Sequence, residues 1–131
     1  MLGTGNLMLL INIYDKAFEK WPKEEYGFTM LHFAAQNGHI NICEYITKNF
    51  HIINLTDYYG NTPFHHAAFN GHLAVCDFIM ENIDDKNPSN NKGQTPLHFA
   101  AVNGHLNVCN YIMEKNDNKN PMDNRSVNLL F

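Results

Sequence analysis

Hydrophobic positions in residues 60–92 predict two short helices followed by a polar loop. Thr62 suits a helix N-cap, and Pro63 suits the first helical position, where a missing N–H costs nothing. The apolar run predicts a helix from Pro63 to about Phe69, and Gly71 can take the positive φ of a C-terminal turn. A second helix is expected from about Leu73 to Glu81. Its apolar positions are Leu73, Val75, Cys76, Ile79 and Met80.

The polar stretch "NIDDKNPSNNKG" (residues 82–93) is rich in Asn, Asp, Pro and Gly, which favours turns and an extended finger-like loop. Each helix is only about two turns long, too short to be stable alone in water. The paired alanines Ala67 and Ala68 allow helices to approach closely. We therefore expect stacked neighbouring units to supply the hydrophobic core.

The whole pattern recurs with a period of 33 residues. Gly27, Gly60 and Gly93 are each 33 apart, and residues 60–92 align on 93–125 without gaps at 20 identical positions. Such agreement predicts three full repeats, at 27–59, 60–92 and 93–125. The same offset relates His32, His65 and His98, then Cys43, Cys76 and Cys109, and three copies of "NGH" at 37–39, 70–72 and 103–105.

The repeated motif stands as "FTMLHFAAQNGH", "NTPFHHAAFNGH" and "QTPLHFAAVNGH". Its period and its TPLH-like core resemble the ankyrin repeat. The resemblance implies an all-α fold, an α-solenoid of helix-turn-helix repeats with β-hairpin-like finger loops. Met30 stands where the other copies have proline, so we expect the first repeat to be somewhat less stable.

One position departs from the family pattern. The family usually has glycine after the second helix, where this chain has Phe50, Ile83 and Asn116. Phe and Ile resist positive φ. We therefore expect the turn to move back by one residue, onto Asn49 and Asn82.

Both ends resemble parts of a repeat. Residues 5–13, "GNLMLLINI", overlay "GHINICEYI", which predicts that 1–26 is a degenerate capping half-repeat with a finger around 21–26. Residues 126–131 overlay the start of a further repeat that is truncated or degenerate. Either the finger ends the domain, or the chain is a piece of a longer array. The apolar Leu129, Leu130 and Phe131 favour the longer array.

Composition narrows the functional classes. The length of 131 residues suits a single domain, and the formal net charge of -4 argues against non-specific nucleic-acid binding. No apolar run reaches the roughly 18 residues of a membrane span. Residues 7–13 are apolar but too short, and they lack the basic leader of a signal peptide. Three cysteines suit a reducing compartment, so we expect a cytoplasmic or nuclear protein.

The residues with reactive side chains are better explained by structure than by catalysis. Equivalent atoms in stacked helices lie roughly 8–10 Å apart, whereas zinc ligands lie about 2 Å from one ion, so the repeated histidines cannot share a metal. His65 and His66 should project in different directions. The repeated cysteines should be core residues, and we expect the acidic residues to be scattered and solvent-facing. We expect no catalytic residue, no metal site and no cofactor. The resemblance implies that each motif's first histidine hydrogen-bonds within the loops and that its second ties helix to finger.

The resemblance also implies that a partner protein docks on the finger tips and on the exposed side of the first helices. The recurring Asn37, Asn70 and Asn103 could instead have a role in loop structure. The Tyr58–Tyr59 pair is the expected hot spot, unless those rings pack between neighbouring fingers. The predicted contact residues are Glu25, Tyr26, Phe28, Gln36, Tyr58, Tyr59, Asn61, Phe69, Asn91, Lys92, Gln94 and Val102.

A modification site is a further expectation from the resemblance. Finger asparagines of ankyrin proteins can be hydroxylated by an oxygen-dependent hydroxylase, and Asn54 in "HIINLTD" fits best. Asn87 and Asn120 are each followed by proline, which makes them poorer candidates. In that case the chain would be a substrate of an enzyme.

These observations predict a non-catalytic scaffold that binds a partner protein through its concave face, as a monomer or as part of a longer array. The alternative is a regulatory or substrate-recruiting segment of a larger signalling enzyme, such as a kinase or a ubiquitin ligase. A third alternative is a purely structural array without a specific partner.

Overall fold

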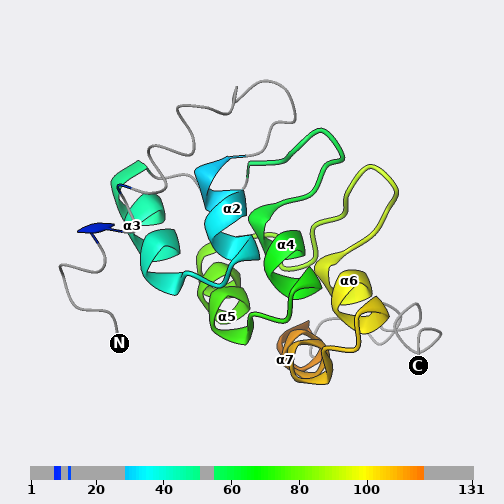
Figure 1. Ribbon diagram of the computed structural model, residues 1–131. Coiled ribbons are helices and arrows are strands. Elements are labelled where there is room, and N and C mark those ends of the chain that lie inside the picture. Colours follow the sequence, from blue (N-terminus) through cyan, green and yellow to red (C-terminus); the bar gives the residue numbers. More distant parts are fainter. Residues whose placement is uncertain (1–7, 10–11, 13–28, 51–54, 117–131) are drawn as a thin grey trace.

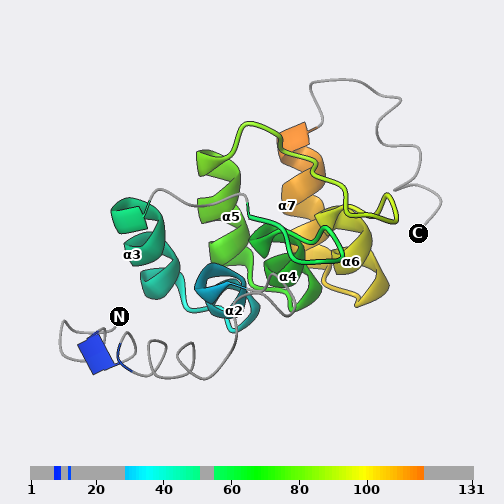
Figure 2. The same ribbon diagram turned by 90° about the horizontal axis from the view of Figure 1, so that it is seen from above.

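The computed structural model describes residues 29–50 and 55–116, together with Met8, Leu9 and Asn12. The described residues form helices and loops, without a β-strand. The first helices of the repeats lie side by side, and the second helices form a layer behind them (Figure 1). The first layer is α2 (Met30–Gln36), α4 (Pro63–Phe69) and α6 (Pro96–Val102), and the second is α3 (Ile40–Phe50), α5 (Leu73–Asn82) and α7 (Leu106–Asn116). Viewed from above, the two layers form two rows (Figure 2).

Each helix of the first layer begins with the same cap. The Oγ1 atom of Thr62 accepts a hydrogen bond from the backbone N–H of His65, and Pro63 is the first helical residue. Thr29 and Thr95 cap α2 and α6 in the same way. The predicted caps and the predicted helix Pro63–Phe69 are therefore confirmed.

Short glycine turns connect the two layers. Gly38, Gly71 and Gly104 follow the first helices with φ of 72°, 75° and 74°, a conformation that favours glycine. The predicted second helix, 73–81, is confirmed to within one residue, because α5 runs from Leu73 to Asn82.

The core lies between neighbouring repeats, as the stacking argument predicts. Ala34, Ala67 and Ala100 are fully buried, which lets α2, α4 and α6 pack closely against one another. Cys43, Cys76 and Cys109 are buried and free of disulfides, so their prediction as small core residues is confirmed. Burial raises the pKa of the Cys43 and Cys76 thiols to about 12, so both remain protonated at neutral pH.

The predicted turn at Asn49 and Asn82 is wrong. Asn49 lies inside α3, and Asn82 is the last residue of α5, with Ile83 extended at φ -116°. The amide of each asparagine donates to a carbonyl four residues earlier, so both side chains bond back onto their own helix. At the end of α5, the Lys86 ammonium donates to the carbonyls of Met80 and Ile83. A lysine thus satisfies the Met80 carbonyl, which a glycine turn would otherwise satisfy.

The expected capping half-repeat falls almost wholly outside the described residues. Met8, Leu9 and Asn12 are helical and exposed. The finger expected around 21–26 and the segment 126–131 lie outside the described part of the chain.

Candidate functional site

Two finger loops end in the same five-residue turn, at 57–61 and at 90–94. In the first turn the N–H of Asp57 donates to the carbonyl of Asn61 at 2.9 Å, and the N–H of Gly60 donates to the carbonyl of Asp57 at 3.0 Å. The equivalent bonds of the turn 90–94 measure 2.8 and 2.9 Å. The two fingers therefore present their side chains from the same backbone frame.

A buried side chain holds each turn from inside. The Oδ1 atom of Asp57 accepts from the backbone N–H groups of Tyr59 and Asn61, both at 2.9 Å. Asn90 Oδ1 accepts the two equivalent bonds in the next finger. Asp57 and Asn90 are each only 8% exposed. The expectation that the acidic residues face solvent is therefore wrong at Asp57, because its carboxylate takes up the donors of the turn.

His32 joins the start of α2 to the next finger. Its Nδ1 accepts from the N–H of Thr29 at 3.1 Å, and its Nε2 donates to the carbonyl of Asn61 at 2.9 Å. Since Nδ1 accepts and Nε2 donates, the ring is the neutral Nε2–H tautomer. Burial lowers the pKa of His32 to about 4, which agrees with a neutral ring.

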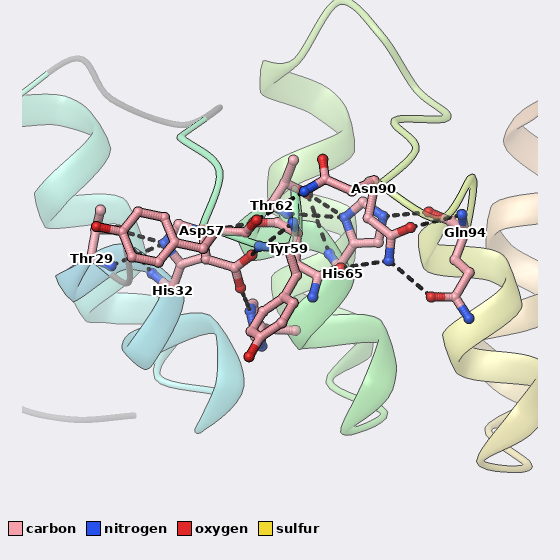
Figure 3. Close-up of polar contacts among 12 residues, drawn as sticks. Thr29, His32, Asp57, Tyr59, Thr62, His65, Asn90 and Gln94 are labelled. Carbon is pink, nitrogen blue, oxygen red and sulfur yellow. Dashed lines mark hydrogen bonds and ion pairs between the residues drawn. The ribbon is translucent and has the colours of Figure 1, made fainter. Parts of the chain in front are cut away.

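His65 repeats the arrangement one unit along the chain, as Figure 3 shows. Its Nδ1 accepts from the N–H of Thr62 at 3.0 Å, and its Nε2 donates to the carbonyl of Gln94 at 2.9 Å. Burial also lowers the pKa of His65. The first histidine of each motif thus hydrogen-bonds to the cap and, at His32 and His65, to a finger of the following repeat.

The second histidine of the motif has a different role from the one implied by the resemblance. His72 Nε2 donates to the carbonyl of Gln36 at 2.9 Å, and His105 Nε2 donates to the carbonyl of Phe69 at 3.0 Å. Both acceptors are the last residues of first-layer helices. The expectation of a helix-to-finger tie is therefore wrong, because these rings lie at the opposite end of the helix and join two repeats there.

The fingers also bond directly to each other, which sequence reasoning missed. Asn91 donates from its backbone N–H to the carbonyl of Tyr59 at 2.9 Å and from its amide to the carbonyl of Tyr58 at 2.8 Å. The Asn90 amide donates to Asn61 Oδ1 at 2.9 Å. The finger turns 57–61 and 90–94 are therefore held as one surface. The consecutive asparagines at 90 and 91 were a signal in the sequence that could have indicated this contact.

This geometry agrees with a comparison with known families. A family model described as "Ankyrin repeats (3 copies)" matches residues 4–90 and 49–123. The chain belongs to the ankyrin repeat family. A search of curated proteins found no match. Ankyrin repeats are generally protein–protein interaction modules and are typically non-catalytic.

The ankyrin fold leaves aromatic side chains exposed at the finger turns. Tyr58 is 60% exposed and Tyr59 is 64% exposed, so these rings do not pack between the fingers. Their carbonyls are held by Asn91 while their rings face solvent. Asn61, Asn91, Lys92 and Gln94 belong to the same two turns, so the structure brings the predicted contact residues of both turns together.

The predicted helix positions form a separate group. Gln36, Phe69 and Val102 are the last residues of α2, α4 and α6, and all three are exposed. A first-layer helix of seven residues is about 10 Å long and separates them from the finger turns. The predicted surface thus has two edges, one at each end of the first helices.

The recurring asparagines at the helix ends bond to helix carbonyls, and their alternative role in loop structure stays a prediction. The amides of Asn37 and Asn70 donate to carbonyls in their own helices, and the Asn103 amide donates to Phe69 of the preceding repeat. The predicted contacts Glu25, Tyr26 and Phe28 and the predicted hydroxylation site Asn54 lie outside the described residues.

His66 is a residue whose role the sequence reasoning missed. Its Nε2 lies 3.0 Å from Asp57 Oδ2, and its ring packs edge-on against His32 with centroids 5.4 Å apart. Phe33 and Phe99 occupy the equivalent position in the other repeats. The change from phenylalanine to histidine was the available signal, because it breaks an otherwise regular motif.

The described histidines and cysteines of this arrangement are engaged in hydrogen bonds or buried, so the arrangement can hold a surface in place. His32 and His65 are neutral rings engaged in hydrogen bonds, and the cysteines are buried thiols with raised pKa. Of the helices in the described part of the chain, none has the length and apolar character needed to cross a bilayer.

Proposed function

We propose that this ankyrin-repeat chain is a non-catalytic scaffold that captures a partner protein with its finger–helix surface. We define that surface as the finger-turn edge (Tyr58, Tyr59, Asn61, Asn91, Lys92 and Gln94) and the helix-end edge (Gln36, Phe69 and Val102). Glu25, Tyr26 and Phe28 are proposed to extend it over the preceding finger. The proposed repeat units are 27–59, 60–92 and 93–125, flanked by a capping segment 1–26 and a further start at 126–131.

The observation that carries this proposal is the pair Tyr58 and Tyr59. Two large rings are more than half exposed on a turn whose backbone is fixed by hydrogen bonds to a neighbouring finger. Tyrosine is enriched at binding hot spots because it buries much area at little entropic cost. A rigid backbone further reduces the ordering cost of association.

The test compares capture by the wild-type chain with capture by Tyr58→Ala/Tyr59→Ala. Their backbone hydrogen bonds do not need the rings, so the melting temperature should stay nearly unchanged. Proteins captured from a lysate are identified by mass spectrometry, and the dissociation constant is then measured with the purified partner. We expect at least a tenfold loss of affinity in the double variant.

A matched control is Asn110→Ala/Glu114→Ala, which alters exposed residues of α7 in the second layer. It should bind like wild type. Equal capture by wild type and Tyr58→Ala/Tyr59→Ala would reject the finger-turn edge as the binding site. A large drop in melting temperature would show that the rings stabilise the fold.

A further inference from the structure

One cluster in the described residues brings three metal-ligating side chains together. His32, Asp57 and His66 each place one ligand atom within 4.8 Å of the others. They come from α2, from the finger turn and from α4. His32 and Asp57 are buried, and His66 is partly exposed, so an ion could enter from the His66 side.

The next repeat shows what is specific to this cluster. Its equivalent residues are His65, Asn90 and Phe99, and the histidine there makes the same bonds to cap and finger. Phe99 packs on His65 with centroids 5.4 Å apart, as His66 packs on His32. The fold therefore needs neither the Asp57 carboxylate nor the His66 imidazole. Both add ligand atoms to a frame that is complete without them.

The donor set fits a first-row divalent ion. Two imidazole nitrogens and one carboxylate oxygen are a usual ligand set for Zn²⁺ and for related ions. In a tetrahedral zinc site the ligand atoms lie about 3.4 Å apart, given bonds of roughly 2.1 Å. His66 Nε2 and Asp57 Oδ2 are already 3.0 Å apart. To bring all three ligand atoms to bonding distance of one ion, the partly exposed His66 side chain has to move most.

Neighbouring groups already orient two of the ligands. Asp57 Oδ1 is held by two backbone N–H groups, which leaves Oδ2 directed at His66. The His32 ring is fixed by Thr29, so its Nε2 is the nitrogen left for an ion. Binding there requires His32 Nε2 to give up its proton and its bond to Asn61, and His32 Nδ1 to give up the bond that it accepts from the Thr29 N–H. Through exchange with solvent, His32 Nδ1 takes up a proton and donates it to Thr29 Oγ1, which lies 2.8 Å from Nδ1 in this structure. His66 Nε2 likewise gives up the proton it donates to Asp57 Oδ2, and through exchange with solvent the His66 Nδ1 carries one instead.

We propose that His32, Asp57 and His66 form a binding site for one divalent transition-metal ion such as Zn²⁺. The ion connects α2, the finger turn 57–61 and α4, and so fastens the first two described repeats to each other. Ligands that bind only the folded state stabilise it by mass action. Metal occupancy thereby strengthens the same part of the scaffold that presents Tyr58 and Tyr59.

The experiment uses the full chain, freed of metal with a chelator and titrated with Zn²⁺ and, in parallel, Co²⁺. Calorimetry should give one site, the melting temperature should rise with Zn²⁺, and Co²⁺ should develop the visible absorption of a bound ion. In ¹⁵N spectra the imidazole of His32 should change from the Nε2–H to the Nδ1–H tautomer. That tautomer change distinguishes this cluster from the chain's other histidines.

The control variant is Asp57→Asn/His66→Phe, which installs the residue pair of the next repeat and is therefore expected to fold. Asp57→Asn alone is a second variant, because Asn90 shows that an asparagine holds the same turn. Each should lower the Zn²⁺ affinity at least tenfold and abolish the melting shift. The site is rejected if wild type shows no saturable binding, if the double variant binds equally well, or if His32 keeps its tautomer.

Discussion

The second finger, with the turn 57–61, and the third finger, with the turn 90–94, share one backbone frame but differ in the side chains attached to it. In both, a buried Asx side chain holds the turn and a neutral histidine ties the finger to the preceding helix start. The second finger adds the Asp57–His66 pair, where the third has Asn90 and Phe99. The shared bonds therefore define the scaffold, whereas the unshared pair is open to a separate role.

The comparison also explains how a histidine-rich motif can serve a structural frame. The first histidine of each motif takes the place of the glutamate in a capping box, because its ring accepts from the N–H of the capping threonine. A second nitrogen is then available for a carbonyl of the next repeat. Histidine thus joins a helix cap to an inter-repeat contact, which a carboxylate could not do because it has no donor.

Acidification should break the shared frame, and this is the largest effect that we expect. Burial lowers the pKa of His32 from 6.5 to about 4, so between these values the unfolded state binds more protons than the folded state. Stability is full above about pH 6.5 and falls as the pH drops toward 4, by about 3 kcal/mol for His32 alone. Urea denaturation at pH 7 and pH 4 measures the loss.

An NMR titration of His32 and His65 measures the pKa of each ring on its own. The pKa of His65 is also lowered by burial, so both rings should titrate below 6.5. If either ring titrated at its ordinary value, the neutral donor–acceptor arrangement assigned to its network would be incorrect.

The sequence predicted the repeated parts of this molecule well. The caps Thr29, Thr62 and Thr95, the helix 63–69 and the glycine turn at Gly71 follow from local chemistry that each repeat contains in full. Local signals sufficed because each residue's main partner lies within a few positions along the chain.

Contacts between repeats were predicted less well. His72 bonds to Gln36 and Asn91 bonds to Tyr58, and both partners lie more than 30 residues away. The turn after α5 was mispredicted for a different reason, because the nearby Lys86 bonds back to the carbonyls of Met80 and Ile83. Partners that are distant in sequence depend on the packing geometry of neighbouring repeats, which a motif read one repeat at a time does not encode.

Alanine substitutions at Gly60 and Gly93 should lower the free energy of unfolding by different amounts, and both losses should be smaller than the effect of acidification. Gly60 and Gly93 have φ of 79° and 76°, so both substitutions strain the backbone by about 1 kcal/mol. A Cβ at Gly60 would lie 2.8 Å from the backbone N of Asn91, whereas at Gly93 no described atom lies within 4 Å. Gly60→Ala should therefore lower the free energy of unfolding by at least about 2 kcal/mol, and Gly93→Ala by about 1 kcal/mol. Equal losses would show that the fingers do not approach as closely as described.

Replacing Asp57 and His66 with the residue types of Asn90 and Phe99 should have the smallest effect on the free energy of unfolding of the metal-free protein. His66→Phe alone leaves the buried Asp57 Oδ2 without its imidazole donor, which costs about 1–3 kcal/mol. Asp57→Asn/His66→Phe also removes that buried charge and installs an aromatic ring where Phe99 packs on His65. The double variant should therefore remain within about 1 kcal/mol of wild type. Urea denaturation of the wild type, both single variants and the double variant completes a thermodynamic cycle. A double variant less stable than His66→Phe would mean that the turn 57–61 depends on the Asp57 carboxylate itself, and that the turns 57–61 and 90–94 do not share one frame.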